Sequence, residues 1–599
     1  MLLFGDRLAR GDDGGSDMTD LQGVIGLLHR VDWTRLSLSA DVHSETDQDL
    51  WTSRVRATRP HWVPEDRAWR FRENPQNTPL TWEEATGDEL VGYHSWDTRL
   101  LIAPGGRYRQ EYQDEPSGRA IGSDAERSWV WRPQDPPPPG HIAHKPPLPQ
   151  LFCPSDLLTE YTLEVRGPVT ACDRDAIAVQ ATPRADTGPG LRTSLPDQLD
   201  VIVDAELGIL LRYEATFEGQ RLSLTELTAV VLDPPEAADL SRFAPPAGSR
   251  ISQDPEDSPR ETSRGPGREA ANTVLGLAMG GLGAGIRFAP HLPGRHSFAE
   301  TDFQEAMPPA EPAVLEPEDA PAPSDDVLYL LYRSGDIPAF TAILDEWQDL
   351  TAMSAWAPDS LRAAGHGGVG YLLDSLPAMT HGKPVVHTVS RLRARGRDKY
   401  RIDYLTGRNH PKTIACDGEH CWQVFADRTM VGPARPMGGH MATVVDSSWL
   451  LGCRLSGGAE ISYRGRRAYQ LRAAKGGDGW WTAPVLFFPA DVIVDAELGC
   501  LLRLLSFAGD KPESWYELSG IGTEPVPAAE FHLDIPPGVR VVEQTGNPFI
   551  DMTAVMPGPA GTVIRTAADV VRRTSDAVSA TRSFLDDLRG RAVVKSSRG

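Results

Sequence analysis

The chain has 599 residues, of which 40% are hydrophobic and 24% charged, and its formal net charge is -23 at pH 7. This length exceeds what one hydrophobic core supports, so several domains are expected, and the apolar fraction excludes a chain that is disordered throughout. The acidic surface repels phosphates and so excludes broad nucleic-acid binding. No apolar run reaches about 18 residues, so no membrane-spanning helix is predicted.

The chain begins with MLLFGDRLARGDDGG, whose short apolar run is followed at once by charges. The long apolar segment of a secretory signal is missing, so we expect a cytoplasmic protein. Met18 is an alternative start to Met1, because Thr19 or Asp20 would cap the helix predicted next. In that helix, TDLQGVIGLLHRVDW, one stripe is apolar: Leu21, Val24, Ile25 and Leu28.

Short segments rich in β-branched and aromatic residues follow this helix, and turn signals separate them. They include YRQEY, RSWVW, LTEYTLEV, AIAVQA, DVIVDA, ILLRYEATF and SLTELTAV. Many such strands at close intervals predict a sheet-dominated antiparallel domain. We place this first domain, with its N-terminal helix, at 19–251.

One of these strands belongs to a stretch that occurs twice. Residues 200–212 read DVIVDAELGILLR and residues 491–503 read DVIVDAELGCLLR, so they are identical except at one position. The alternation in DVIVD predicts a strand, and ELG predicts a turn whose glycine takes a positive φ. We therefore predict a β-hairpin at both places. Asp204 and Asp495 are interpreted as turn formers, with a catalytic role as the alternative.

The agreement between the two regions extends outward from this stretch. The leucine pair at 157–158 recurs at 450–451, and each region has a turn followed by a tryptophan, SDAERSW ending at Trp129 and CDGEHCW ending at Trp422. Because order and spacing agree, we interpret the chain as one domain present twice. The second copy is placed at 327–543.

The second domain is predicted to begin with helices over DDVLYLLYRSGDIPAFTAILDEWQDL. The apolar residues of these helices are Val327, Leu330 and Leu331, followed by Phe340, Ile343, Leu344 and Trp347. The helical prediction covers both groups.

Two further segments lie outside the repeated domains. Residues 252–326 are rich in proline and charge and have no periodicity, which predicts a disordered linker with one short apolar segment, 274–288. That segment lacks the G-x-G-x-x-G spacing of a phosphate-binding loop. Residues 560–590 predict an amphipathic C-terminal helix, whose apolar face would pack on the protein or contact a membrane surface peripherally.

The sequence offers little that is typical of catalysis. The motifs G-x-S-x-G, G-x-x-x-x-G-K-[ST] and H-E-x-x-H are missing. Cys416 and Cys421 bracket a predicted turn and face each other across it. They are interpreted as buried thiols, with a disulfide or a metal site that includes His420 as alternatives. A cleft in which His94 meets carboxylates would indicate an enzyme. We expect no enzymatic activity, no cofactor and no metal.

Each region, with its succession of strands and its VDAELGxLLR hairpin, resembles the LolA/RseB-like group of carriers and sensors. The resemblance covers residues 34–250 and 380–543. It implies an α+β, β-dominated fold, in which a strongly curved antiparallel sheet wraps around helices, here in two tandem copies joined by the disordered linker. It also implies an apolar cavity between sheet and helices that takes acyl chains or an apolar peptide.

The expected function is therefore non-catalytic binding of an apolar ligand such as a lipid or acyl chain. The candidate lining residues share a strand face within each copy and are Trp129, Trp131, Trp422 and Val424. The alternative is a two-headed protein-interaction scaffold or regulatory adaptor, since tandem copies raise avidity when both engage one assembly. An uncharacterised enzyme is the second alternative. A lipid, another apolar molecule or a protein is the expected partner, and nucleic acid is not.

Overall fold

The computed structural model describes residues 20–251, the first half, and residues 320–543, the second half. The description leaves out residues 48, 51–68, 73–80, 85–92, 114–119, 126–127, 132–147, 185–195, 247–249, 337–338, 350–384, 397, 407–411, 426–427, 435–436, 438–442, 475–488, 509–510 and 536–537. Most of the predicted linker, its segment 274–288, the C-terminal helix at 560–590 and both candidate start residues lie outside the described residues.

The first half forms one sheet of 11 strands, in the order β13-β7-β6-β5-β4-β1-β12-β11-β10-β9-β8. Its strands are β1 (Leu38–Asp47), β4 (Tyr93–Ala103), β5 (Arg107–Tyr112), β6 (Ala120–Asp124), β7 (Ser128–Trp131), β8 (Tyr161–Ala171), β9 (Arg174–Pro183), β10 (Gln198–Asp204), β11 (Leu210–Phe217), β12 (Gln220–Leu232) and β13 (Arg250–Ile251). All neighbouring strands are antiparallel. A separate ribbon pairs β2 (Trp69–Arg72) with β3 (Thr81–Glu84).

The second half forms a sheet of 12 strands, in the order β20-β21-β22-β23-β24-β14-β15-β16-β17-β18-β19-β25. Its strands are β14 (Phe340–Asp349), β15 (Val385–Arg395), β16 (Lys399–Tyr404), β17 (Thr413–Asp417), β18 (His420–Val424), β19 (Arg428–Pro433), β20 (Arg454–Tyr463), β21 (Arg466–Ala474), β22 (Ala490–Asp495), β23 (Leu501–Ala508), β24 (Lys511–Gly522) and β25 (Arg540–Glu543). Only β19 and β25 pair in parallel among the described strands. The predicted β-dominated fold with two large sheets is confirmed, and the described strand pairs other than β19 with β25 are antiparallel.

The second helix predicted at the start of the second half is wrong. Residues Phe340–Asp349 form strand β14, which lies between β15 and β24. Phe340, Ala342 and Leu344 are buried and alternate with partly exposed residues, which is the period of a strand. The same apolar residues also satisfy a helical spacing, and pairing with two neighbouring strands decides in favour of the strand.

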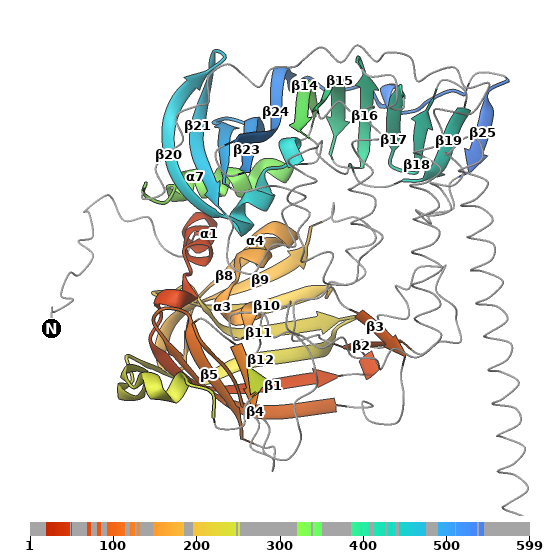
Figure 1. The fold of residues 1–599 in the computed structure, drawn as a ribbon. Helices are drawn as coiled ribbons and strands as arrows, with labels where there is room; N and C mark the ends of the chain where they lie inside the picture. Colours follow the sequence, from red (N-terminus) through yellow and green to blue (C-terminus); the bar gives the residue numbers. More distant parts are fainter. Residues whose placement is uncertain are drawn as a thin grey trace, which may run out of the picture.

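Short helices lie between the two sheets (Figure 1). They are α1 (Leu21–His29), α3 (Pro149–Phe152) and α4 (Ser155–Glu160) from the first half, and α7 (Asp325–Arg333) and the short turn η7 (Ser448–Gly452) from the second. Helix α1 packs on α7, and α4 packs on η7. Buried residues of both halves therefore belong to one continuous hydrophobic core. In each sheet the face toward the helices is called the inner face, and the opposite face the outer face.

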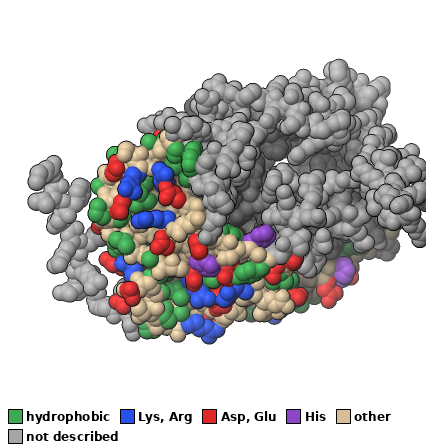
Figure 2. Space-filling model, turned by 90° about the horizontal axis from the view of Figure 1, so that it is seen from below, with side chains coloured by type: hydrophobic (Ala, Val, Ile, Leu, Met, Phe, Trp, Pro, Cys, Tyr) green, Lys and Arg blue, Asp and Glu red, His purple; other side chains and the backbone are tan. Residues whose placement is uncertain are grey.

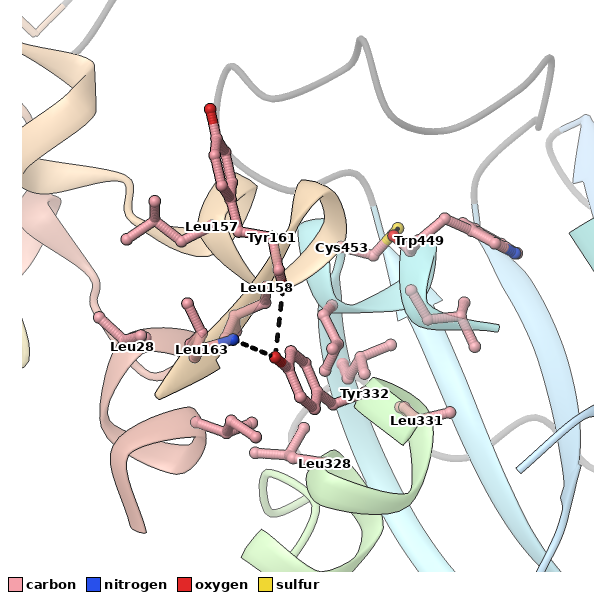
Figure 3. Packing of buried hydrophobic residues seen from close by; sticks show 14 of the residues in the cluster. Leu28, Leu157, Leu158, Tyr161, Leu163, Leu328, Leu331, Tyr332, Trp449 and Cys453 are labelled. Carbon is pink, nitrogen blue, oxygen red and sulfur yellow. Dashed lines mark hydrogen bonds between the residues drawn. The ribbon is translucent and has the colours of Figure 1, made fainter. Parts of the chain in front are cut away.

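The two halves contact each other through side chains at two matching places, one on each side of the interface. The Tyr332 hydroxyl of α7 donates to the Tyr161 carbonyl at 3.2 Å and accepts from the Leu163 amide at 2.7 Å (Figure 3). In the other direction, Nε2 of His29 at the end of α1 contacts the Cys453 carbonyl at 3.3 Å. Arg184 adds to the first contact, because its guanidinium donates to the Tyr332 carbonyl and lies 4.4 Å from the Tyr332 ring.

The two contacts occupy corresponding places. The register of β8 with β9 and that of β20 with β21 place Tyr161 and Cys453 at equivalent positions, the first residue of β8 and the residue just before β20. His29 lies two residues after Leu27, whose carbonyl is approached by Gly208 of the first hairpin. Tyr332 likewise lies two residues after Leu330, whose carbonyl is approached by Gly499 of the second hairpin. An interface in which each half contacts the other through the same surface has the geometry of a two-fold symmetric dimer.

Candidate functional site

The duplicated stretch forms a hairpin in each half, as predicted. Strand β10 pairs with β11, and β22 pairs with β23. Oδ1 of Asp204 accepts from the amides of Glu206 at 2.9 Å and Leu207 at 2.8 Å, and the carboxylate is paired with Arg174. The buried Asp204 carboxylate is thus used to hold the turn and the neighbouring strand β9.

The second hairpin repeats this arrangement. Oδ1 of Asp495 accepts from the amides of Glu497 at 3.0 Å and Leu498 at 2.8 Å, and its carboxylate is paired with Arg466. Hydrogen bonding to Asp495 raises the pKa of Arg466 above its usual value. The interpretation of both aspartates as turn formers agrees with these contacts.

The glycine of each hairpin explains why the turn packs so closely on the helices. Gly208 has φ of +72° and Gly499 has φ of +74°. A Cβ atom added to Gly208 would lie 2.5 Å from the Leu27 carbonyl oxygen of α1, and one added to Gly499 would lie 2.6 Å from the Leu330 carbonyl oxygen of α7. Turn conformation, ion pair and helix contact therefore constrain the same residues in both halves.

Trp129 lies on the outer face of the first sheet. It is fully buried, and its indole N–H donates to the Phe243 carbonyl at 2.9 Å. Across the strands it is aligned with Gly122, Arg109 and Leu101. Leu101 packs with Phe243, whereas its sequence neighbours Leu100 and Ile102 belong to the core on the inner face. The turns η2 (Pro235–Ala238) and η3 (Leu240–Phe243), here called the first closing segment, contact this part of the outer face.

Trp422 occupies the corresponding place in the second sheet. It is buried, aligned with Ala415 and Arg401, and its ring packs edge-on against His532 with 5.0 Å between centroids. Trp131 and Val424 are half-buried and share a strand face with Trp129 and Trp422 respectively. The four candidate lining residues thus form two separate pairs on two outer faces. Their role as ligand lining stays a prediction.

A pocket of about 250 Å³ lies beside Trp129, on the outer face of the first sheet. Its lining residues come from β4, β5 and the first closing segment and are Arg99, Leu101, Arg109, Glu111, Glu236 and Arg242. Arg109 is held in place, because Nε pairs with Glu111 at 2.6 Å, Nη1 donates to the Arg242 carbonyl at 3.1 Å, and the guanidinium lies 5.8 Å from the Trp129 ring. The pocket is lined mainly by charged side chains.

Sequence reasoning did not single out these arginines. The alternation of RYRQEY places Arg107, Arg109 and Glu111 on one strand face, which is a weak signal because such a face is usually just solvated. Arg242 lies 133 residues from Arg109 along the chain. Nothing in the local pattern shows that the closing segment returns to this strand.

The rest of the outer face of the first sheet carries an ion-pair network. Its members, from strands β4, β1, β12 and β11, are Asp97, His43, Glu45, Arg221, Glu214 and Arg212. The first four contacts measure 2.7, 3.0, 3.1 and 2.9 Å. Hydrogen bonds to Glu45 and Asp97 raise the pKa of His43 above its usual value. Figure 2 shows acidic, basic and histidine side chains mixed on the face seen from below.

The second sheet differs at the centre of this face. The aligned residues Glu45, Leu224 and Glu214 of the first sheet correspond by register to Trp347, Trp515 and Leu505. Trp347 and Leu505 are buried. Among the described residues, the first outer face therefore has a partly exposed charged network at the place where the second has apolar side chains.

The other chemical candidates are not assembled into a site in the described part of the chain. Cys416 and Cys421 lie opposite each other as predicted and are buried thiols. The Nε2 atom of His94 on β4 is buried without a hydrogen-bond partner among described residues. In the described ranges no group of three or more His, Cys, Asp or Glu side chains could hold a metal ion. None of the described helices is long and apolar enough to cross a membrane.

Comparisons with known proteins find similarity only among solved structures. No family model matches, and no curated protein matches. MucB is 14% identical with a TM-score of 0.24, over 40% of this chain and 66% of the MucB chain. The MucA/MucB complex of Pseudomonas aeruginosa gives 14% identity, a TM-score of 0.23, and 38% and 62% coverage. A LolA superfamily protein from Nitrosomonas europaea is 11% identical with a TM-score of 0.17, over 37% of this chain and 97% of the Nitrosomonas chain.

The chain thus spans just under two thirds of the length of the MucB structures it matches. These likenesses concern the fold of part of the chain. The fold itself rests on the strand register described above.

Proposed function

We propose that the chain is a non-catalytic binding protein that presents the outer face of its first sheet to a protein partner. The observation that supports this proposal is that the inner faces of both sheets are already covered by the protein itself. Helices α1 and α4 pack on α7 and η7, so the inner faces of both halves are enclosed in one core. The charged network and the pocket beside Trp129 remain accessible on the outer face.

An apolar ligand between sheet and helices is the second candidate, because the LolA/RseB-like fold suggests it. In the described part of the molecule this space is filled by side chains with no exposed area, such as Leu100, Ile102 and Leu158. A lipid or acyl chain would have to displace such residues, which costs the free energy of their burial. Binding on the outer face needs no such displacement, and we therefore favour a protein partner.

The test compares the full chain with variants of equal charge change. The double variant Arg212→Glu/Arg221→Glu alters the network of the first sheet, and Arg454→Glu/Arg467→Glu makes the same change in net charge on the second. A partner protein retained by the wild type and the second variant, and lost from the first, supports the proposal. If the chain instead co-purifies with stoichiometric lipid by mass spectrometry and retains no protein in this charge-dependent way, the apolar-ligand candidate replaces it.

A further inference from the structure

The pocket beside Trp129 has a counterpart in the second half. Arg109 donates to the Arg242 carbonyl at 3.1 Å, and Arg401 donates to the Glu530 carbonyl at 3.3 Å. Because Arg109 and Arg401 hold the same place in the register, the carbonyls of Arg242 and Glu530 occupy corresponding places in the two closing segments. The second closing segment contains the turn η8 (Ala528–Glu530).

In the second half this place is filled by the protein's own side chains. Arg393 pairs with Asp403 at 3.0 Å and with the Glu530 carboxylate at 3.2 Å. Arg401 also pairs with Asp403 at 3.0 Å. The closing segment thus supplies a carboxylate that neutralises the arginines of the strands below it.

In the first half the closing segment supplies side chains of both charges to the pocket, Glu236 and Arg242. Arg242 stands where the second half has Glu530, and Leu101 stands where it has Arg393. Arg109 is already paired with Glu111. Arg99 makes no ion pair among the described residues, and Arg242 has only Asp239 at 3.9 Å, a long contact. The pocket of the first half therefore holds three arginines, Arg99, Arg109 and Arg242, against two carboxylates, Glu111 and Glu236.

We propose that this pocket binds a carboxylate side chain of an acidic segment in the partner protein. Arg99 and Arg242 would donate to the carboxylate oxygens, since a guanidinium matches a carboxylate with two parallel hydrogen bonds. Arg109, whose guanidinium lies 5.8 Å from the centre of the Trp129 ring, also lines the pocket. The inference rests on the proposed binding function and adds the chemical class of the ligand. It also explains how a chain of net charge -23 offers a local site for an anion.

The experiment titrates the full chain with blocked hexaglutamate peptide in a calorimeter, with blocked hexaglutamine peptide and inorganic phosphate as comparison ligands. Saturable binding of hexaglutamate alone is expected. Arg242→Glu introduces the carboxylate found in the second half and should weaken binding about tenfold or more, because it both removes a donor and repels the ligand. Arg467→Glu, an exposed site on the other half with the same charge change, should leave binding unchanged.

Three outcomes overturn the inference: no saturable binding of hexaglutamate, equal loss in both variants, or phosphate binding as tight as hexaglutamate. The last would identify a general anion site rather than a carboxylate site. Failure here is separable from failure of the proposed function. If a partner protein is still retained through the network of the first sheet while Arg242→Glu has no effect, only the carboxylate assignment is lost.

Discussion

At the scale of single residues, the ionisable side chains of His29 and Asp204 have different structural roles. His29 closes the interface between the halves as a neutral side chain, since burial lowers its pKa to about 4 and its Nδ1 atom has no partner among the described residues. Asp204 holds a turn through its carboxyl oxygens, with Arg174 and two amides as partners. Each makes a testable contribution to stability.

The first prediction concerns His29 and pH. Its pKa is about 6.5 in an unfolded chain and about 4 in the folded one, so unfolding takes up a proton between these values. Stability conferred by the neutral ring is therefore complete above pH 6.5 and is lost as pH falls toward 4, by at most about 3 kcal/mol. Arg30, next to His29, also disfavours the charged form.

Denaturant unfolding at pH 7 and at pH 4.5 measures this difference. His29→Gln keeps a donor for the Cys453 carbonyl but does not titrate, so its stability should fall less over the same interval. An identical pH dependence in wild type and variant would contradict the assignment.

The second prediction concerns Asp204. Replacing it with Ala removes the acceptor of two turn amides and the buried partner of Arg174, and removing one partner of a buried pair typically costs about 3 kcal/mol or more. Glu206→Ala is the matched control, because Glu206 pairs with the same arginine but its side chain is 76% exposed. We expect little change for the control in thermal or denaturant unfolding. Equal effects of the two substitutions would show that the buried pair does not hold the hairpin.

At the scale of elements, the local sequence pattern predicted those helices and hairpins whose structure depends on residues close together in the chain. The alternation in DVIVD and the turn ELG correctly indicated the hairpins, and the stripe containing Val24, Ile25 and Leu28 correctly indicated α1. The strand β14 was missed because its apolar spacing satisfies two periods. The pocket was missed because it depends on a closing segment that returns to β5 from far along the chain.

The third prediction separates the two constraints on a hairpin glycine. Gly208 and Gly219 both have positive φ, +72° and +76°, but only at Gly208 would a Cβ meet the helix, 2.5 Å from the Leu27 carbonyl oxygen. Gly219→Ala should cost about 1 kcal/mol for the backbone conformation alone. Gly208→Ala should cost clearly more, because the hairpin must also move away from α1. The two free energies of unfolding, measured side by side, check this, and a smaller cost at Gly208 would refute the contact.

At the scale of the whole molecule, the halves are joined by more than the connecting chain. Tyr332 inserts its hydroxyl between two backbone groups of the first half, and Arg184 returns the contact. The two halves share a hydrophobic core that the sequence did not indicate, because its helices are distant along the chain: Gln22 of α1 and Asp326 of α7 lie 304 residues apart. No periodicity within either helix indicates which partner its stripe will meet.

The fourth prediction is that cutting the chain does not separate the halves. A protease site introduced between residues 251 and 320 should yield two fragments that co-elute on size exclusion until denaturant is added. Tyr332→Phe removes one of the two donors of the Tyr161 carbonyl, which still accepts from Nε of Arg184 at 3.3 Å, and it removes the hydroxyl acceptor of the buried Leu163 amide, which costs about 1–3 kcal/mol. The cut variant should therefore dissociate at lower denaturant concentration. Fragments that elute apart without denaturant would contradict the shared core.

The matched contacts of His29 and Tyr332 have a further consequence. A two-fold interface between separate chains weakens on dilution, whereas the same interface inside one chain is held at a fixed effective concentration. The contact surface of each half then no longer has to be complementary to an identical copy of itself. One half can keep a histidine where the other has a tyrosine, and one closing segment can keep an arginine where the other has a glutamate, without loss of assembly at any protein concentration.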